Sequence, residues 1–311
     1  MTSAFAHTPV LLSETIAALQ PRSGGLYVDA TLGGGGHAER VLELSSPNGV
    51  LLGVDADPAA LKAARQRLAG FGDRLITVES YFDDLGAIAE RTGFGKSDGI
   101  LFDLGVSSPQ LDTAERGFSF GTDAPLDMRM GPSADTSAAE VVNQWSQKQL
   151  ERVFSDYGEE RFARRIARAI VEQRRAGPIA TTGQLSALIA RARPRSREGI
   201  HPATRVFQAL RIAVNGELDR LQRALPQAVE VLQSGGRLVV ISFHSLEDRI
   251  VKRFMRDEAR GCVCPPEVPV CVCGRTPRLR IISPRPIVAT PDEVERNPRA
   301  RSAKLRVAER L

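Results

Sequence analysis

No run of about 18 apolar residues, the length that a membrane-spanning helix needs, occurs in the sequence. The first residues also lack a basic patch followed by an apolar stretch, so we expect no secretory signal and a cytoplasmic protein. Cysteine is scarce, and all four cysteines lie between 262 and 273. In a reducing compartment such a cluster argues against a disulfide framework. Internal repeats and low-complexity tracts are absent as well.

The chain of 311 residues is long enough for one large domain or two ordinary ones, and its 42% apolar content suffices for a sizeable core. Its net charge is +5. Residues 151–215 hold thirteen Arg, no Lys and six Asp or Glu, a net charge of +7. The basic character therefore belongs to this segment, and it suits a polyanionic partner.

Short apolar runs alternate with helical patterns at both ends of the chain, whereas residues 138–192 have only helical spacing. The apolar runs are continuous, which is typical of a parallel sheet covered on both faces. We predict a Rossmann-like α/β domain made of residues 1–112 and 204–311, interrupted by an all-helical domain over 113–203. Its strands are predicted at 26–30, 49–54, 75–78, 99–104, 237–242, 279–289 and 303–309. Its later helices are predicted at 206–232, ended by Gly235-Gly236, and at 246–255.

A glycine-rich turn, Gly33 to Gly36, follows the first predicted strand and opens a helix. Glycine is needed where the chain turns tightly and a cofactor approaches bare backbone. Asp55 lies twenty residues after Gly35, at the end of the next strand, where an acid can accept both ribose hydroxyls of a nucleoside. The turn, its strand and the spaced acid indicate a nucleoside cofactor; a purely structural turn is the alternative.

The residues around the turn distinguish between nucleoside cofactors. A dinucleotide fingerprint has a third glycine where this chain has Ala38, a variant that some such sites tolerate. Asp29 is more informative, because an acid beside the turn suits the ammonium group of S-adenosylmethionine and would repel a pyrophosphate. His37 is placed to contact the cofactor carboxylate, or else lies on the surface. Phe82 is placed to face the adenine, or else belongs to the core.

The loop from Asp103 to Gln110 follows the fourth strand, and ligands bind at the carboxyl ends of parallel strands. It is similar to the Asp/Ser-Pro-Pro-aromatic signature of enzymes that methylate exocyclic amines of cytosine or adenine. Such an amine is a poor nucleophile. The carbonyl before Pro109 and the side chain of Ser108 or Asp103 can each accept an N–H and aim the lone pair at the methyl group. We predict Asp103, Ser108 and Pro109 as the catalytic residues; an ordinary Ser-Ser-Pro turn is the alternative.

Gln110 stands where the signature has an aromatic residue, so base stacking must come from elsewhere, and Phe118 and Phe120 are candidates. Orientation of two reactants can supply roughly 7–11 kcal/mol of a barrier. We therefore expect alignment to dominate, with no catalytic triad and no catalytic metal.

Motifs along nearly the whole chain resemble those of one family, ribosomal RNA small subunit methyltransferase H, bacterial enzymes that methylate cytosine N4 in 16S rRNA. The motifs are His7–Leu12, Asp103–Asp112, Arg116–Phe120, Pro125–Met130, Tyr157–Ala163, His201–Ala209 and Ile241–Arg249. The resemblance implies a class I S-adenosylmethionine-dependent methyltransferase fold and a decoding-centre cytidine in the assembled small subunit as substrate. The cofactor contacts that it implies are Gly35, Gly36, His37, Asp55, Phe82, Asp103 and Gln110.

Two other functions stay open at this point. An adenine-N6 or protein-glutamine methyltransferase fits the loop chemistry nearly as well. A non-catalytic RNA-binding assembly factor is the third possibility, although the intact set of Asp29, Gly33, Gly35, Asp55 and Asp103 argues against loss of activity. The oligomeric state is open.

Basic side chains of the helical segment are candidate contacts to rRNA phosphates; they are Arg161, Arg164, Arg165, Arg168, Arg191 and Arg193. A solvated arginine-rich surface is the alternative. His244 follows the fifth strand and is a candidate for lining the base pocket; for Ser245, a role at the start of the helix is the alternative.

The four cysteines, Cys262, Cys264, Cys271 and Cys273, have two thiols on each side of a short span, which suits zinc. Their Cys-x-Cys spacing is tighter than the usual Cys-x₂-Cys, and a metal at this site is left open.

Overall fold

The computed structural model describes residues 9–132, 134–193, 201–262, 264, 270 and 273–311. The chain divides into two compact units, one with residues up to Gly105 and from Leu218 on, the other from Val106 to Glu217. These boundaries differ from the predicted 113 and 203, because α5 (Ser108–Asp112) and α10 (Thr204–Asn215) belong to the second unit. Buried side chains of α10 pack in the core of that unit.

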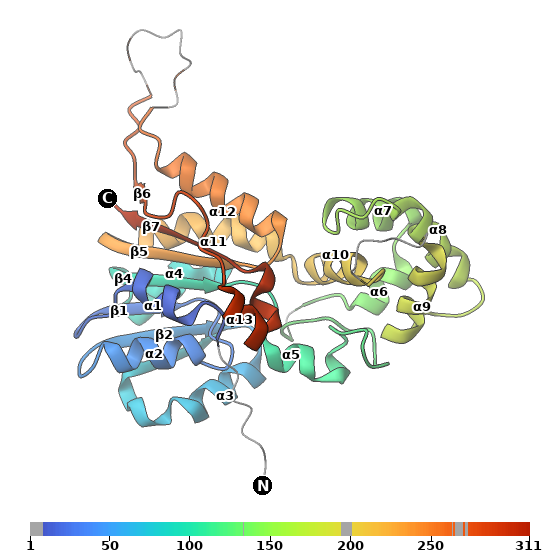
Figure 1. The fold of residues 1–311 in the computed structure, drawn as a ribbon, viewed down its shortest axis with the longest axis horizontal. Coiled ribbons are helices and arrows are strands. Elements are labelled where there is room, and N and C mark those ends of the chain that lie inside the picture. Colours follow the sequence, from blue (N-terminus) through green and yellow to red (C-terminus); the bar gives the residue numbers. More distant parts are fainter. Residues whose placement is uncertain (1–8, 133, 194–200, 263, 265–269, 271–272) are drawn as a thin grey trace. The chain divides into compact units, whose positions relative to one another are not determined.

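The first unit contains a seven-stranded sheet in the order β3-β2-β1-β4-β5-β7-β6 (Figure 1). Strands β1 to β5 are parallel, and β7 is antiparallel to β5 and β6. This order and the nucleotide-binding pattern of the first strands confirm the predicted Rossmann-like fold of class I methyltransferases. The strands are β1 Leu26–Asp29, β2 Val50–Asp55, β3 Leu75–Glu79, β4 Ser97–Asp103, β5 Leu232–Ser242, β6 Leu279–Ile281 and β7 Lys304–Arg310.

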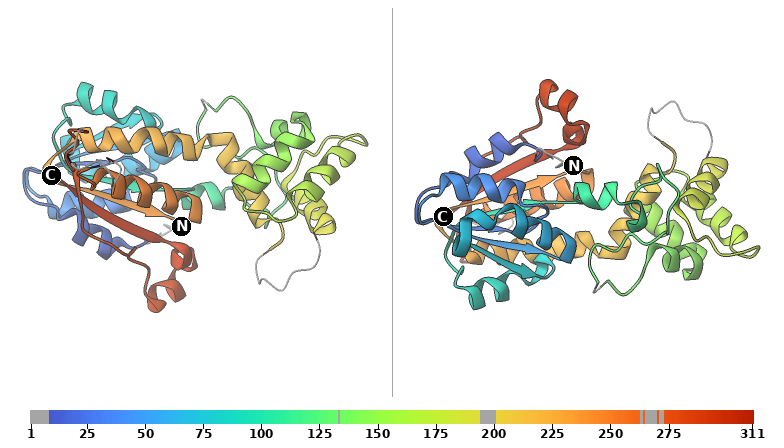
Figure 2. Two further views of the ribbon diagram at one scale, coloured as in Figure 1. Left: turned by 90° about the horizontal axis from the view of Figure 1, so that it is seen from above. Right: turned by 90° about the horizontal axis from the view of Figure 1, so that it is seen from below.

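Helices cover both faces of this sheet, and Figure 2 shows the two layers. One face carries α1 (Leu12–Leu19), α2 (Gly36–Leu44) and α3 (Pro58–Arg67). The opposite face carries α4 (Leu85–Thr92), α11 (Glu217–Val231) and α12 (Ser245–Glu258). Because both faces are filled with apolar side chains, polar groups of the central strands gather at the strand ends. The remaining elements of the unit are η1 Ala69–Arg74, η2 Phe82–Asp84, α13 Pro291–Arg296 and η4 Pro298–Ser302.

The prediction of one helix over 206–232 is wrong. Gly216 adopts the left-handed conformation with φ 59° and ends α10, and α11 begins at Glu217. The apolar periodicity continues across this break, so periodicity alone does not reveal it. Gly235 and Gly236 do not cap a helix; they lie within β5, whose pairing with β4 is irregular between Ser97 and Gly99.

The predicted strand over 279–289 is also too long, since β6 ends at Ile281. Beyond it, only Ile287 forms an isolated bridge, to Leu305 of β7. Pro284 and Pro286 lie between, and proline has no N–H to donate to a neighbouring strand. No helix within the described ranges has the length and apolar character to cross a membrane.

The second unit is built of helices, as predicted for 138–192. Four of them begin with a capping box, in which a Ser or Thr side chain and a Gln or Glu three residues later satisfy the first free N–H groups. These short helices therefore have defined starts and bury their apolar faces in one common core. The elements are α5, η3 Ala114–Arg116, α6 Ala138–Gln144, α7 Gln147–Asp156, α8 Ala163–Gln173, α9 Thr182–Ala192 and α10.

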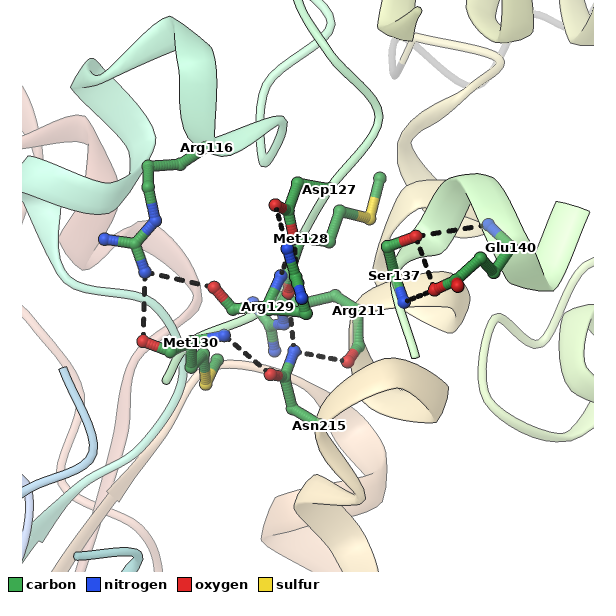
Figure 3. Close-up of polar contacts among 9 residues, drawn as sticks. All are labelled: Arg116, Asp127, Met128, Arg129, Met130, Ser137, Glu140, Arg211 and Asn215. Carbon is green, nitrogen blue, oxygen red and sulfur yellow. Dashed lines mark hydrogen bonds and ion pairs between the residues drawn. The ribbon is translucent and has the colours of Figure 1, made fainter. Parts of the chain in front are cut away.

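A buried asparagine holds the loop over 125–130, one of the family-like motifs (Figure 3). The Asn215 Nδ2 donates to the carbonyl of Met128 at 2.8 Å, and its Oδ1 accepts from the Met130 N–H at 2.8 Å. Arg116 donates to the carbonyls of Arg129 and Met130 at 3.0 and 2.9 Å. Met128 itself is buried with φ 63°, a conformation that costs energy for a residue with a side chain. The loop is thus held in a strained shape by side chains from η3 and α10.

Replacement of Asn215 by alanine is expected to destabilise the second unit by about 1–3 kcal/mol, because it leaves a buried N–H and a buried carbonyl unpaired. Urea unfolding of the full chain, followed by hydrogen exchange at 125–130, measures the effect. Gln144→Ala, on an exposed position of α6, is the control and should change little. Equal stability of Asn215→Ala and the control would contradict the assigned role.

Candidate functional site

The glycine turn between β1 and α2 requires glycine at specific positions. Gly33 and Gly35 have φ values of 51° and 78°, in the left-handed region. A Cβ on Gly35 would lie 2.9 Å from Leu68 Cδ1, and one on Gly36 would lie 2.4 Å from Pro9 Cγ. Glycine is therefore required here by the left-handed backbone and by close packing against Leu68 and Pro9, at the carboxyl end of β1.

Asp55, the last residue of β2, is bound to this turn. Its Oδ2 accepts from the Gly33 N–H at 2.7 Å, and its Oδ1 accepts from the Asp57 N–H at 2.8 Å. Burial raises the pKa of Asp55 to about 6, against the opposing effect of these hydrogen bonds. Each carboxylate oxygen has a second lone pair, so Asp55 can still accept a hydroxyl of a bound nucleoside.

Asp29 and Asp103 complete a group of carboxyls at the ends of β1, β2 and β4. Asp29 is 3% exposed, and its burial together with the charge of Asp55 raises its pKa to about 7. The Asp103 side chain keeps 28% of its surface accessible, but protein surrounds it otherwise. This desolvation has the largest effect on Asp103, and the negative charges of Asp29 and Glu247 add to it. Together they raise the pKa of Asp103 to about 8. Because three acids share one poorly hydrated region, a positively charged ligand is strongly favoured there.

One atom of this group points to a ligand directly. The Oδ1 of Asp103 is buried and has no hydrogen-bond partner among the described residues. A buried acceptor without a partner is costly, and such atoms are typical of sites that a ligand completes. The residues thus fit a cofactor that carries positive charge near β1 and β4 and a nucleoside near β2.

His37, predicted as a cofactor contact, lies at the start of α2 and is 5% exposed, which excludes the alternative of a surface position. Its Nε2 lies 3.0 Å from the carbonyl of Val10, which can only accept, so this nitrogen carries the proton. The lone pair of Nδ1 then faces Asp103 Oδ2 at 3.6 Å. His37 therefore lies beside Asp103. Phe82 lies edge-on to Phe102 with ring centroids 5.7 Å apart and is partly buried against the core.

His244 and Glu247, at the start of α12, form a second polar pair near the end of β5. His244 is the N-cap residue: its Nδ1 accepts from the Glu247 N–H at 3.4 Å, and the carboxylate accepts from the Phe243 N–H at 2.9 Å. The role at the helix start thus falls to His244, and Ser245 is exposed. The reasoning from sequence gave Glu247 no role, although it is 2% exposed and acts on the pKa of Asp103.

A cavity of about 320 Å³ adjoins this helix start. His244 and Ser245 line it together with Arg301 and Lys304, two basic residues that the sequence analysis missed. Both come from the C-terminal η4–β7 segment, which is more than 50 residues away in the sequence, so no local pattern could have placed them here. The His244 side chain is 9% exposed at this cavity, and its role in lining a base pocket stays a prediction.

The loop with the amine-binding signature enters the second unit at Val106. Ser107 caps α5, and Gln110, 6% exposed, returns its side chain to the Ser107 N–H at 3.0 Å. Gln110 therefore has a structural task in addition to the predicted cofactor contact. Pro109 is exposed, and the side chain of Ser108 lies outside the described part of the chain.

The two rings predicted to stack the base are packed within the second unit. Phe118 is 7% exposed in its core. Phe120 stacks on His201 with centroids 4.4 Å apart and meets Phe207 edge-on at 5.0 Å. Phe118 is therefore largely taken up by the core of the second unit, and Phe120 is partly buried with one stacked ring contact.

A basic groove of about 460 Å³ lies between α8 and α9. Arg165, Arg168 and Arg191 line it over an apolar floor that includes Leu188, and Arg168 pairs with Glu172 at 2.7 Å. Arg161 and Arg164 are exposed nearby in the sequence.

The prediction that Arg193 contacts RNA is wrong for this structure. Its side chain is 2% exposed and lies 3.6 Å from the fully buried carboxylate of Glu160. A guanidinium buried against an acid holds the unit together and is not accessible to a phosphate.

Known proteins resemble this chain over nearly its whole length. The MraW methylase family model matches residues 4–311. The chain is 58% identical over 309 residues to ribosomal RNA small subunit methyltransferase H of Geobacter sulfurreducens, covering 99% of both chains. It is 55% identical over 305 residues to the protein of the same name from Thermomicrobium roseum, covering 98% of this chain and 94% of that one. Among solved structures, an rRNA methylase from Streptococcus thermophilus aligns with TM-score 0.42 and 11% identity over 99% of each chain.

The raised pKa values predict how stability depends on pH without ligand. A carboxyl whose pKa is higher in the folded than in the unfolded protein binds its proton more tightly when folded, so stability falls as the pH rises from about 4 toward 8. Asp103→Asn removes the largest of these shifts. This substitution should raise the Tm at pH 8 by about 2–4 °C for each kcal/mol by which the free energy of unfolding increases. It should also make the Tm depend less on pH. Calorimetry measures this, with the exposed Asp73→Asn as control; a profile as steep as wild type would contradict it.

Proposed function

The chain belongs to the MraW methylase family, and we propose that it methylates the N4 amine of a decoding-centre cytidine in 16S rRNA of the small ribosomal subunit. S-adenosylmethionine is the methyl donor. The observation that carries the proposal is the buried, unpartnered Oδ1 of Asp103 at the end of β4, beside the carboxyls of the cofactor site. The names of the relatives support an rRNA substrate.

The acids at the ends of β1 and β2 bind and orient the cofactor. S-adenosylmethionine supplies a methyl group on a positively charged sulfur, together with an ammonium group and a nucleoside. Asp29 lies beside the glycine turn and is placed for positive charge, and Asp55 is placed for ribose hydroxyls. Nearby positive charge favours the ionised forms of these acids, so binding lowers pKa values that burial has raised.

Asp103 acts on the amine. Its free Oδ1 accepts one amine N–H, which leaves the nitrogen lone pair directed at the methyl group. The ionised Asp103 carboxylate can also take the proton that the amine loses once it is methylated. His37 lies beside Asp103 at the start of α2 and is proposed as a contact to the cofactor. Ser108 and Pro109 are proposed to offer the second acceptor for the amine.

The second unit is proposed to hold the rRNA. The α8–α9 groove combines three guanidinium groups with an apolar floor, which suits a phosphodiester backbone and its sugars. Taking a cytidine out of a base stack costs a few kcal/mol, and contacts of this kind can offset that cost.

The proposed reaction is tested by incubating the protein with labelled S-adenosylmethionine and small subunits that lack the modification, then mapping the labelled nucleotide. Label on N4 of one cytidine is expected. Asp103→Asn should lower kcat about 10²–10⁴-fold, since it removes the proton acceptor, while Asp73→Asn should keep wild-type turnover. Label on adenine or on protein would replace the proposal with one of the other amino-methyltransferase functions, and no label would favour an assembly factor.

The role of the groove is tested separately, by the double change Arg165→Glu and Arg191→Glu. Reversal of two charges should weaken binding to small subunits and flatten its salt dependence, because fewer phosphates are neutralised. The affinity for S-adenosylmethionine should stay unchanged. Arg152→Glu, an 84% exposed arginine of α7 outside the groove, is the matched control. Unaltered subunit binding in the double variant would remove the groove from the rRNA interface.

A further inference from the structure

Three cysteine sulfurs converge in the segment between α12 and β6. The Sγ atoms of Cys262, Cys264 and Cys273 all lie within 4.8 Å of one another. Those of Cys262 and Cys273 are 3.9 Å apart, although eleven positions separate the two residues in the sequence. Cys271, the fourth cysteine of the chain, lies outside the described residues.

The spacing of the sulfurs discriminates between two kinds of link. In a disulfide the sulfurs are about 2.0 Å apart. Around a tetrahedral zinc ion with Zn–S bonds of about 2.3 Å, neighbouring sulfurs are about 3.8 Å apart. The 3.9 Å between Cys262 and Cys273 matches the second case.

The tight Cys-x-Cys spacing places a backbone N–H next to a cysteine sulfur, which suits a metal site. The Cys264 N–H points at the Cys262 sulfur, with 3.4 Å between nitrogen and sulfur. Backbone N–H groups directed at a ligating sulfur stabilise its negative charge and orient it, as outer-shell contacts of metal sites do. The single intervening residue therefore brings two thiols and a stabilising N–H together.

The base of the segment is closed by hydrogen bonds between its two ends. The Arg278 N–H donates to the carbonyl of Glu258 at 2.8 Å, and the Arg275 guanidinium donates to the carbonyl of Asp257 at 2.7 Å. Cys262 and Cys264 thus lie on the outgoing branch and Cys273 on the returning one. Thiols from both branches meet at one place, where an ion can join them.

We propose that this cluster binds a structural zinc ion, with Cys262, Cys264 and Cys273 as ligands. Each thiol gives up its proton on binding, and no electrons are transferred. Val270, the described apolar residue of this segment, is 71% exposed and so contributes little to a core. A bound metal would supply the cross-link that packing by this residue does not. The role is structural, because the 14 residues of α12 separate the cluster by about 20 Å from His244 at the sheet edge.

The test is metal analysis of the full chain, purified under reducing conditions without added metal. About one zinc per chain is expected. Replacement by cobalt should give the thiolate-to-cobalt charge-transfer absorption and the intense visible bands of a tetrahedral site. Cys262→Ser, Cys264→Ser and Cys273→Ser should each lose the zinc and the charge-transfer intensity. Val270→Ser, in the same segment but without a thiol, should keep both.

The result that would overturn the proposal is a metal-free protein that gives no charge-transfer band on cobalt titration, or equal metal loss in Val270→Ser. A Cys262–Cys273 disulfide in protein kept reduced would also overturn it. Affinity for S-adenosylmethionine, measured on the same variants, should stay at the wild-type level, which separates this site from the cofactor site.

Discussion

The burial of three carboxyl groups at one edge of the sheet is the constraint on which the rest of the site depends. Asp29, Asp55 and Asp103 end neighbouring strands, so the parallel order of β2, β1 and β4 brings them together. Their raised pKa values mean that ionising these carboxyl groups is less favourable in the folded protein than in water. That cost is relieved by a positively charged ligand, and this is why the edge can select a sulfonium cofactor over a pyrophosphate.

The surrounding elements serve this arrangement. The glycine turn donates a backbone N–H to Asp55, and it packs so closely against Leu68 and Pro9 that a Cβ on Gly35 or Gly36 would clash with them. His37 joins α2 to Asp103, and Glu247 faces the same acid from α12. Charged and polar groups from both faces of the sheet thus act on Asp103, whose position at the end of β4 is the basis for proposing that it accepts a hydrogen bond from the reacting amine.

Much of this site could be predicted from local sequence, because strand ends, glycine turns and acid spacing are local signals. Asp29, Asp55 and Asp103 are found in this way, and so is the Rossmann-like fold. Residues brought in from afar could not be: Arg301, Lys304 and Glu247 reach the edge only through the order of the strands. Periodicity failed where one left-handed glycine, Gly216, ends a helix without interrupting the apolar pattern. It also could not tell an exposed arginine from Arg193, whose partner Glu160 lies more than 30 positions away.

The affinity for S-adenosylmethionine as a function of pH, measured by titration calorimetry in buffers of different ionisation enthalpy, tests the central claim most directly. If the carboxyl cluster binds the cationic cofactor, affinity rises as the pH increases from about 6 to 8, and binding at neutral pH releases protons from Asp29 and Asp103 to the buffer. An affinity that is flat or falls over this range, with no proton release, would contradict the account.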